Sequence, residues 1–304
     1  MTGPGAGSPL ARAKRRAALP FLLPLIVTLL LVAGWPLLRT VWLSLTDARL
    51  EAGLAPHFVG IANYTYLLSD PEWWSAVRNT VVFAVTSVAL ETVLGVLIAL
   101  ALNEKMRGRG ILRAAMLIPW AIPTVVAAQM WNWMLHDQYG VVNQALLALG
   151  VVQDPVAFTA DPDLALWTVI AVDVWKATPF MVLLSLAALQ LLPDEIYEAA
   201  EIDGLGPVGR FFRITLPLIR PALMVAVTFR SLDALRVFDL MYILTGNSAA
   251  AASMSVYARQ HLVDFQDVGY GSAAATALFL MIAALTSLLV IAGRIQAAPE
   301  EDDR

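Results

Sequence analysis

Long blocks of apolar residues alternate with short polar segments along this chain. A helix needs about 20 residues to cross the hydrocarbon core of a membrane, at a rise of roughly 1.5 Å per residue. The blocks that meet this length are Leu19–Leu45, Thr80–Leu102, Ala114–Leu135, Leu164–Leu192, Ala222–Thr245 and Ser272–Ala292. Backbone groups in lipid must be satisfied within the segment, so each block is predicted to form a helix. The closely spaced Pro119 and Pro123 predict a break in the third one.

Composition agrees with a membrane protein. Hydrophobic residues make up 59% of the chain and charged residues 14%, against roughly 25% charged residues in an average soluble domain. A soluble fold with so few charges would expose large apolar patches and aggregate.

The chain has no cysteine, so it offers neither disulfides nor thiolate metal sites. No catalytic or metal-binding constellation is visible, and the basic segments are too short to propose nucleic-acid binding. The predicted fold is all-α, with six transmembrane helices in contact with lipid.

The basic residues predict an orientation. Lysine and arginine gather before the first block, between the second and third, and between the fourth and fifth, whereas the other connections are acid-biased. The positive-inside rule then places both termini and the 193–221 loop in the cytoplasm. A cleaved signal peptide over residues 10–45 is the alternative, but its apolar stretch is far longer than the usual 7–15 residues or so. Residues 1–17 and 296–304 are expected to be disordered tails around a transmembrane domain at 18–295.

The 193–221 loop carries a pattern of its own. Proline and two acids begin a short helix after Leu192, and Gly204 is suited to end it in the left-handed conformation. A second short helix is expected after Pro207, with Pro217 and Pro221 leading into the fifth block. From these residues alone, two interpretations stay open: an amphipathic loop on the lipid surface, or a docking helix for a partner.

A family resemblance favours docking. The loop contains Glu198-Ala199-Ala200, followed by Gly204 after three residues and by Ile214-x-Leu216-Pro217 after nine more. This pattern resembles the EAA motif of binding-protein-dependent ABC importer permeases. The segments 173–180, 229–246 and 267–273 resemble signatures of the carbohydrate branch, of the maltose/trehalose type. One departure follows Gly246, where the family's glycine-rich run with proline is replaced by Asn-Ser-Ala-Ala.

The resemblance implies a type I ABC importer permease in the bacterial inner membrane, which forms half of the translocation pathway for a disaccharide such as maltose or trehalose. Its partners would be a second permease subunit, a dimer of ATP-binding subunits and an extracytoplasmic sugar-binding protein. The chain contains no phosphate-binding loop motif, so ATP, Mg²⁺ and hydrolysis are expected in the partner ATPase, and the chain itself is not expected to be an enzyme. The residues implied in ATPase coupling are Glu198, Ala199, Ala200, Asp203, Gly204, Ile214, Leu216 and Pro217.

Ionisable residues inside the fourth and fifth blocks are the second candidate site. A charge near the bilayer centre costs roughly 2.5–3.5 kcal/mol, so these groups must pair or face a polar cavity. Spacing of three residues makes Arg230/Asp233, Asp233/Arg236, Arg236/Asp239 and Asp173/Lys176 candidate ion pairs. The residues expected along a substrate pathway are Lys176, Phe180, Arg230, Asp233, Ala234 and Val237.

The same charges could instead form a structural network between the two helices. That interpretation is preferred for Asp173, Arg236 and Asp239, whereas for Arg230 and Asp233 both interpretations stay open. Glu91, in the second block, has no partner nearby in the sequence, and its role is open.

A different class of function would also use intramembrane carboxylates. An ion-coupled secondary transporter could bind protons or sodium there, but such folds are typically built from inverted repeats with discontinuous helices. No clear internal repeat is found in the sequence, and this alternative leaves the 193–221 loop unexplained. Among substrates, the resemblance favours disaccharides of the maltose or trehalose kind, with oligosaccharides or glycerol phosphates as the next candidates.

Overall fold

The computed structural model describes residues 20–50, 55–104 and 106–297. The tail expected at 1–17 lies outside this range, as do all but the first two residues of the tail expected at 296–304. In the described residues the only β-pairing is an isolated bridge between Thr46 and Phe58, so the predicted all-α class is confirmed. The elements are η1 (Leu30–Gly34), α2 (Trp35–Leu43), α3 (Ala62–Ser69), α4 (Pro71–Asn103), α5 (Arg109–Ala121), α6 (Thr124–Met134), α7 (Val141–Ala148), α8 (Ala165–Leu189), α9 (Asp194–Ile202), α10 (Pro207–Arg210), η2 (Phe211–Thr215), α11 (Leu216–Leu235), α12 (Asp239–Thr245), α13 (Met254–Arg259), η3 (Gln260–Asp264) and α14 (Val268–Ala297), where η marks a π-helical segment.

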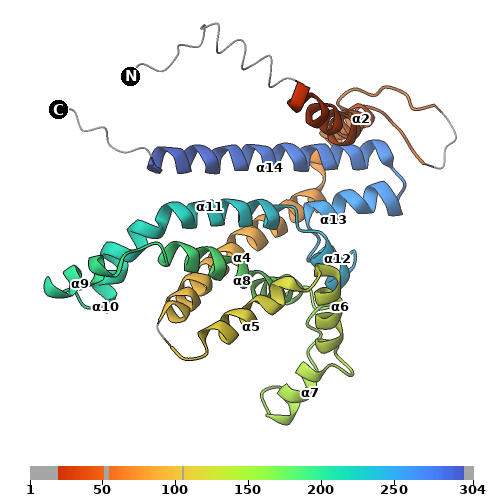
Figure 1. Ribbon diagram of the computed structural model, residues 1–304. Helices are drawn as coiled ribbons and strands as arrows, with labels where there is room; N and C mark the ends of the chain where they lie inside the picture. Colours follow the sequence, from red (N-terminus) through yellow and green to blue (C-terminus); the bar gives the residue numbers. More distant parts are fainter. Residues whose placement is uncertain (1–19, 51–54, 105, 298–304) are drawn as a thin grey trace, which may run out of the picture. The chain divides into compact units, whose positions relative to one another are not determined.

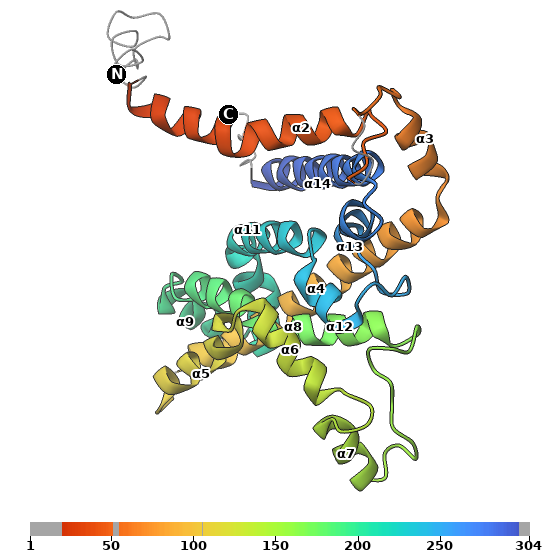
Figure 2. The ribbon, with the colours of Figure 1, turned by 90° about the vertical axis from the view of Figure 1, so that its right-hand side faces the viewer.

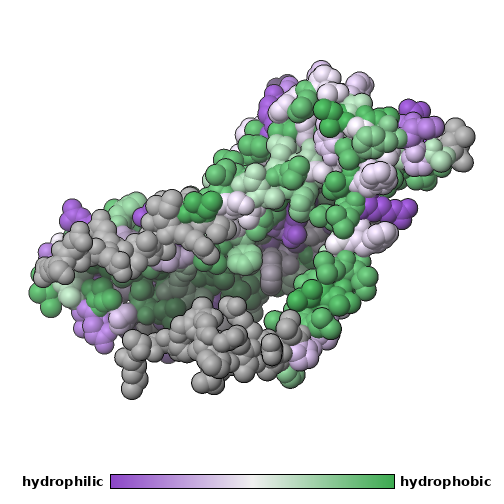
Figure 3. Space-filling view, turned by 90° about the horizontal axis from the view of Figure 1, so that it is seen from above, coloured by the Kyte–Doolittle hydropathy of each residue, from purple (hydrophilic) through white to green (hydrophobic). Residues whose placement is uncertain are grey.

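Helices long and apolar enough to cross a membrane occur where the apolar blocks predicted them. Five are continuous, and there is a sixth if the bent pair α5–α6 counts as one span. The continuous ones are Pro20–Leu43, Pro71–Asn103, Ala165–Leu189, Pro207–Leu235 and Val268–Leu288. Many of their apolar side chains are exposed, Leu31 for example by 67%, and Figure 3 shows apolar residues spread widely over one face of the molecule.

The third block is broken, as its prolines predict. Ile122, which precedes Pro123, is extended with φ −72° and ψ 129°, because proline disfavours the helical conformation in the residue before it. Pro119 remains inside α5. The axes of α5 and α6 are bent by 91° across this break, and Figures 1 and 2 show α6 turning away from α5.

The fifth block differs from its prediction at both ends. Of the expected helix Ala222–Thr245, only the part up to Leu235 is continuous, and it belongs to a longer helix that begins at Pro207. The rest forms α12, which follows separately after Phe238. Pro221 lies inside α11, and Pro217 occupies its first turn, where a missing N–H is tolerated. The second helix of the 193–221 loop is therefore not a separate short helix but the start of the fifth span.

The described residues form two compact units. One contains the described parts of Met1–Leu67 and His261–Thr276. Its loop after α2 is held by the Asn63 amide, which donates to the carbonyls of Ser44 and Thr46 at 2.9 and 2.8 Å. Close packing in this unit requires glycine at 269, because a Cβ there would lie 2.1 Å from the Thr46 carbonyl oxygen.

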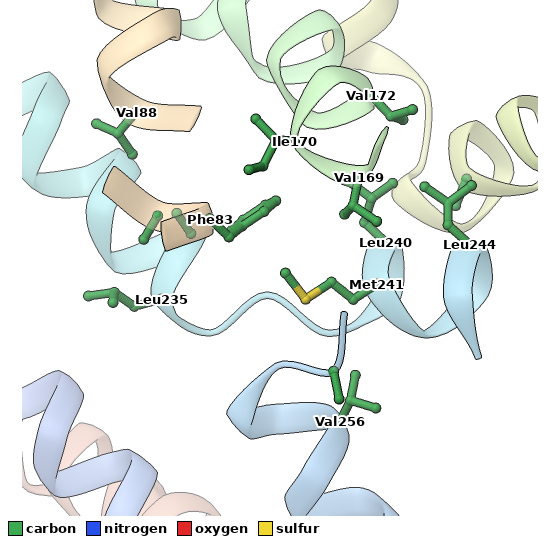
Figure 4. Packing of buried hydrophobic residues seen from close by; sticks show 14 of the residues in the cluster. Phe83, Val88, Val169, Ile170, Val172, Leu235, Leu240, Met241, Leu244 and Val256 are labelled. Atoms are coloured by element: carbon green, nitrogen blue, oxygen red, sulfur yellow. The ribbon is translucent and has the colours of Figure 1, made fainter. Parts of the chain in front are cut away.

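The other unit, Leu68–Gln260 with the described part of Ala277–Arg304, contains the candidate sites. Its largest buried cluster joins α4, α8 and α12 through side chains such as Phe83, Val169 and Met241 (Figure 4). A second cluster nearer α9 includes Val96, Leu186 and Ile219. These two clusters fix α4, α8 and α11 beside one another, which brings polar residues from three distant parts of the sequence together.

Candidate functional site: a charged cavity and a helical loop

A cavity of about 450 Å³ opens between α5, α6, α8, α11 and α12. The residues predicted for the substrate pathway all line it, namely Lys176, Phe180, Arg230, Asp233, Ala234 and Val237. The predicted ion-pair residues Asp173, Arg236 and Asp239 line it as well. The lining of the cavity therefore combines carboxylates with cations. Phe180 adds an aromatic ring, whose centroid lies 6.3 Å from that of the Trp120 ring.

Arg230 is the centre of the charged group. Its Nε donates to Glu91 at 2.6 Å and its Nη2 donates to the other Glu91 oxygen at 3.0 Å. Nη2 also donates to Asp173, and Nη1 donates to Asp233 at 3.2 Å. Three carboxylates from α4, α8 and α11 thus surround one guanidinium.

Pairing explains how this guanidinium is tolerated in an apolar fold. Arg230 is 4% exposed and Glu91 is fully buried. An unpaired buried charge would cost several kcal/mol, whereas the bidentate arrangement satisfies both the guanidinium and the carboxylate. The sequence showed Glu91 as a buried acid without a local partner, and the partner comes from α11.

Asp233 connects this buried group to the cavity. Its side chain is 64% exposed, and its second oxygen accepts from Arg236 at 3.3 Å. The predicted pairs Arg230/Asp233 and Asp233/Arg236 are thus present. In the described part of the chain neither Arg236/Asp239 nor Asp173/Lys176 forms an ion pair. α11 ends at Leu235, so Arg236 and Asp239 do not share a helical turn.

The break between α11 and α12 also decides which side chains of the fifth block reach the cavity. Ala234 and Val237 line the cavity, but Met241 belongs to α12 and is fully buried in the cluster of Figure 4. Backbone without helical hydrogen bonds is tolerated at membrane depth where it lines a polar cavity.

The predicted coupling residues lie on α9 and the start of the fifth span. Glu198, Ala199, Asp203 and Gly204 are exposed, whereas Ala200 is 4% exposed and packs against its own chain. Ile214 and Leu216 are half-buried, and Pro217 is exposed. Ala200, Ile214 and Leu216 therefore support the loop from within, and the others face outward.

Gly204 ends α9 as the sequence predicts. It has φ +76°, its N–H donates to Glu201, and the next N–H, of Leu205, donates to Ala200, each at 3.0 Å. This pair of bonds is a Schellman motif, which favours glycine at the left-handed position. On either side of this glycine in the sequence, Ile202, Val208 and Phe212 are exposed by 87%, 71% and 61%. They leave an apolar surface at the end of α9 and the start of the fifth span.

Comparison with known proteins identifies the family. Residues 91–298 match the model of the binding-protein-dependent transport system inner membrane component. The chain belongs to this family.

Two relatives span nearly the whole permease. The chain is 42% identical over 287 residues to the trehalose/maltose transport system permease protein MalF of Thermococcus litoralis, covering 93% of this chain and 96% of the relative. It is 36% identical over 276 residues to the sulfoquinovosyl glycerol transport system permease protein SmoG of Agrobacterium fabrum, covering 90% and 89%. The resemblance to carbohydrate ABC importer permeases of the maltose/trehalose type is therefore confirmed.

A solved structure supports the fold of this permease. A bacterial ABC transporter involved in the import of the acidic polysaccharide alginate aligns with a TM-score of 0.82 and 22% identity, over 96% of this chain and all of that chain. The family match and the relatives make the protein an inner-membrane permease component of an ABC importer.

Proposed function

We propose that this permease forms half of the translocation pathway for a disaccharide such as maltose or trehalose, and that it is driven by ATP hydrolysis in a separate subunit. The observation that carries the proposal is the composition of the cavity wall. Asp233 and Arg236 offer an acceptor and donors for sugar hydroxyls, and Phe180 offers an aromatic ring beside them. Trehalose and maltose are also named in the relative that shares 42% of its residues.

The charges on the wall favour a neutral sugar. Three acids (Asp173, Asp233, Asp239) and three bases (Lys176, Arg230, Arg236) line the cavity. Such a balance supplies many hydrogen-bonding groups without a strong single-sign field, which suits hydroxyls better than a carboxylate or sulfonate. Asp233 and its neighbours would bind the sugar along this wall beside Arg230, and Ala234 and Val237 leave room for the sugar.

The partners follow from the family and from the loop. We expect a second permease subunit, a dimer of ATP-binding subunits that holds ATP and Mg²⁺, and an extracytoplasmic sugar-binding protein. The exposed Glu198, Ala199 and Gly204 would contact the ATPase, together with the apolar surface around Phe212. The basic segments support a topology with both termini and this loop in the cytoplasm.

Coupling has a direct mechanical route in this arrangement. α10, η2 and α11 form one continuous helical segment, so the start of the fifth span at Pro207 is joined to the cavity residue Arg230 without an intervening loop. A partner that moves α9 and Pro207 would therefore also move the cavity wall, because the continuous helical segment transmits the motion. Closure of an ATPase dimer is the kind of rigid-body motion that such a segment transmits.

Uptake by right-side-out membrane vesicles or proteoliposomes tests the proposal. The complete transporter, with its binding protein, should accumulate radiolabelled trehalose or maltose only when ATP is supplied on the ATPase side. Glu198→Lys should abolish uptake and reduce recovery of the ATPase with the permease. Asp163→Lys, an equally drastic change at an exposed position outside the loop, is the control and should leave uptake unchanged. Uptake driven by an ion gradient without ATP, and indifferent to Glu198, would support the secondary transporter instead.

A further inference from the structure

Glu91 is a buried acid to which the proposed transport function assigns no role. It is fully buried in α4, and it is not among the residues that line the cavity. Both of its carboxylate oxygens nevertheless accept hydrogen bonds from Arg230, at 2.6 and 3.0 Å. This bidentate geometry is that of an ionised carboxylate paired with a guanidinium.

The hydrogen bonds of Arg230 show what this pairing does. A guanidinium has five N–H donors in a fixed plane. Two are used by Glu91, one by Asp173 and one by Asp233. One Nη1 hydrogen remains, so the guanidinium has little freedom to reorient and little capacity for a solute.

Asp233, unlike Arg230, keeps hydrogen-bonding capacity for a solute. Each of its oxygens accepts one bond, from Arg230 and from Arg236. A carboxylate can accept about four hydrogen bonds, so lone pairs remain available on a side chain that is 64% exposed. The group offered to a solute is the carboxylate of Asp233, and the group that orients it is Arg230.

We propose that Glu91 is a positioning and selectivity residue of the transport pathway. The Glu91 carboxylate holds the guanidinium of Arg230 behind Asp233 and compensates the positive charge of that guanidinium. The cavity therefore accepts neutral sugars and disfavours anionic ones. The inference rests on the proposed sugar transport and extends it from the cavity wall to the residue behind the wall.

Electrostatics gives the direction of the effect. Replacing Glu91 by glutamine leaves one negative charge fewer beside Arg230 in a region of low dielectric, where charge interactions are stronger than in water. The guanidinium, with an N–H freed from its former partner, would then attract a carboxylate on a solute. A purely structural role for Glu91, as a tie between α4 and α11, predicts weaker assembly and no change in selectivity.

Displacement of bound sugar tests the inference. Radiolabelled trehalose is bound to the purified complex of both permeases and the ATPase, without the binding protein, so that the binding protein's own preference does not enter. Unlabelled maltose and a disaccharide carrying one glucuronic acid are the competitors. The measured quantity is the ratio of their half-displacing concentrations.

The wild type should favour maltose, and Glu91→Gln should shift the ratio toward the anionic competitor by about tenfold, as expected for loss of one close charge. Glu91→Asp keeps the charge and should stay near the wild type. Asp173→Asn removes another carboxylate from the same guanidinium and should shift the ratio in the same direction, which keeps the test available where Glu91→Gln does not assemble. Glu72→Gln, an exposed acid in the first turn of the same helix, is the matched control.

An unchanged ratio in Glu91→Gln and Asp173→Asn complexes that bind trehalose would overturn the inference and leave the transport function standing. A wild-type complex that binds no sugar and supports no ATP-dependent uptake would instead remove the proposed function, and the inference with it.

Discussion

The hydroxyl of Ser253 donates a 2.8 Å hydrogen bond to the carbonyl oxygen of Val237, in the break between α11 and α12. The same hydroxyl accepts from the N–H of Val256 at 3.2 Å and so caps α13. From α4, the Asn79 amide donates to the carbonyls of Ala250 and Ala252 at 3.1 and 3.2 Å. The non-helical segments before and after α12 are thus held by side chains from other parts of the chain.

Replacement of Ser253 by alanine should destabilise this region. Ser253 is fully buried, and both its hydrogen bond to Val237 and its helix cap would be lost, at a cost of about 1–3 kcal/mol. Thermal unfolding in detergent should show a lower Tm. Ser287→Ala is the control, because the Ser287 hydroxyl is exposed and bonds only within its own helix, to Ala283. Equal Tm values for the two variants would show that the Val237 bond contributes no net stability.

Gly95 should be irreplaceable at the contact between α4 and α8. A Cβ at this position would lie 2.5 Å from the Cβ of Met181 and 3.0 Å from its carbonyl carbon, so Gly95→Ala must push the two helices apart. Overpacking of this kind costs about 1–3 kcal/mol, and a lower yield of folded protein on size-exclusion chromatography should report it. Gly110→Ala, in α5 with no atom within 4 Å of its Cβ position, should be neutral or slightly stabilising.

The end of α9 depends on the left-handed conformation of Gly204. No atom lies within 4 Å of a Cβ built there, so Gly204→Ala acts through its φ of +76° alone, at about 1–2 kcal/mol. We expect weaker recovery of the ATPase with the permease and slower ATP-dependent uptake. Gly206→Ala is matched closely, because its surroundings are equally open but its φ is −67°. Similar losses in both variants would argue against a conformational cause.

Phe180 should contribute to sugar transport through its ring. Phe180→Ala removes an apolar face from the cavity, and loss of about 1.5–3 kcal/mol of contact with the sugar would lower uptake by at least about tenfold. Phe180→Tyr should retain most of the rate. Phe279→Ala, at an exposed position in α14, is the control for removal of a phenylalanine. Full activity of Phe180→Ala would exclude its ring from the pathway.

Local sequence signals predicted the elements whose causes are local. The apolar blocks have the length that a helix needs to span lipid, where backbone groups must be satisfied within the segment. Pro123 breaks the third block, and Gly204 ends α9. The residues that carry the charges of the cavity could also be named, because ionisable groups inside an apolar block must find a partner or a polar space.

The pairings and the break in the fifth span are decided by the tertiary structure. Glu91 and Arg230 are 139 residues apart, and the apolar pattern between Ala222 and Thr245 continues without a glycine or proline after Leu235. The helix can stop there because Ser253 satisfies the Val237 carbonyl. The sequence by itself determines which segments are helical and which charges need compensation, since both depend on the cost of exposing polar groups to lipid. Which side chain compensates which charge depends on the packing of α4, α8 and α11, and periodicity along one helix carries no information about that packing.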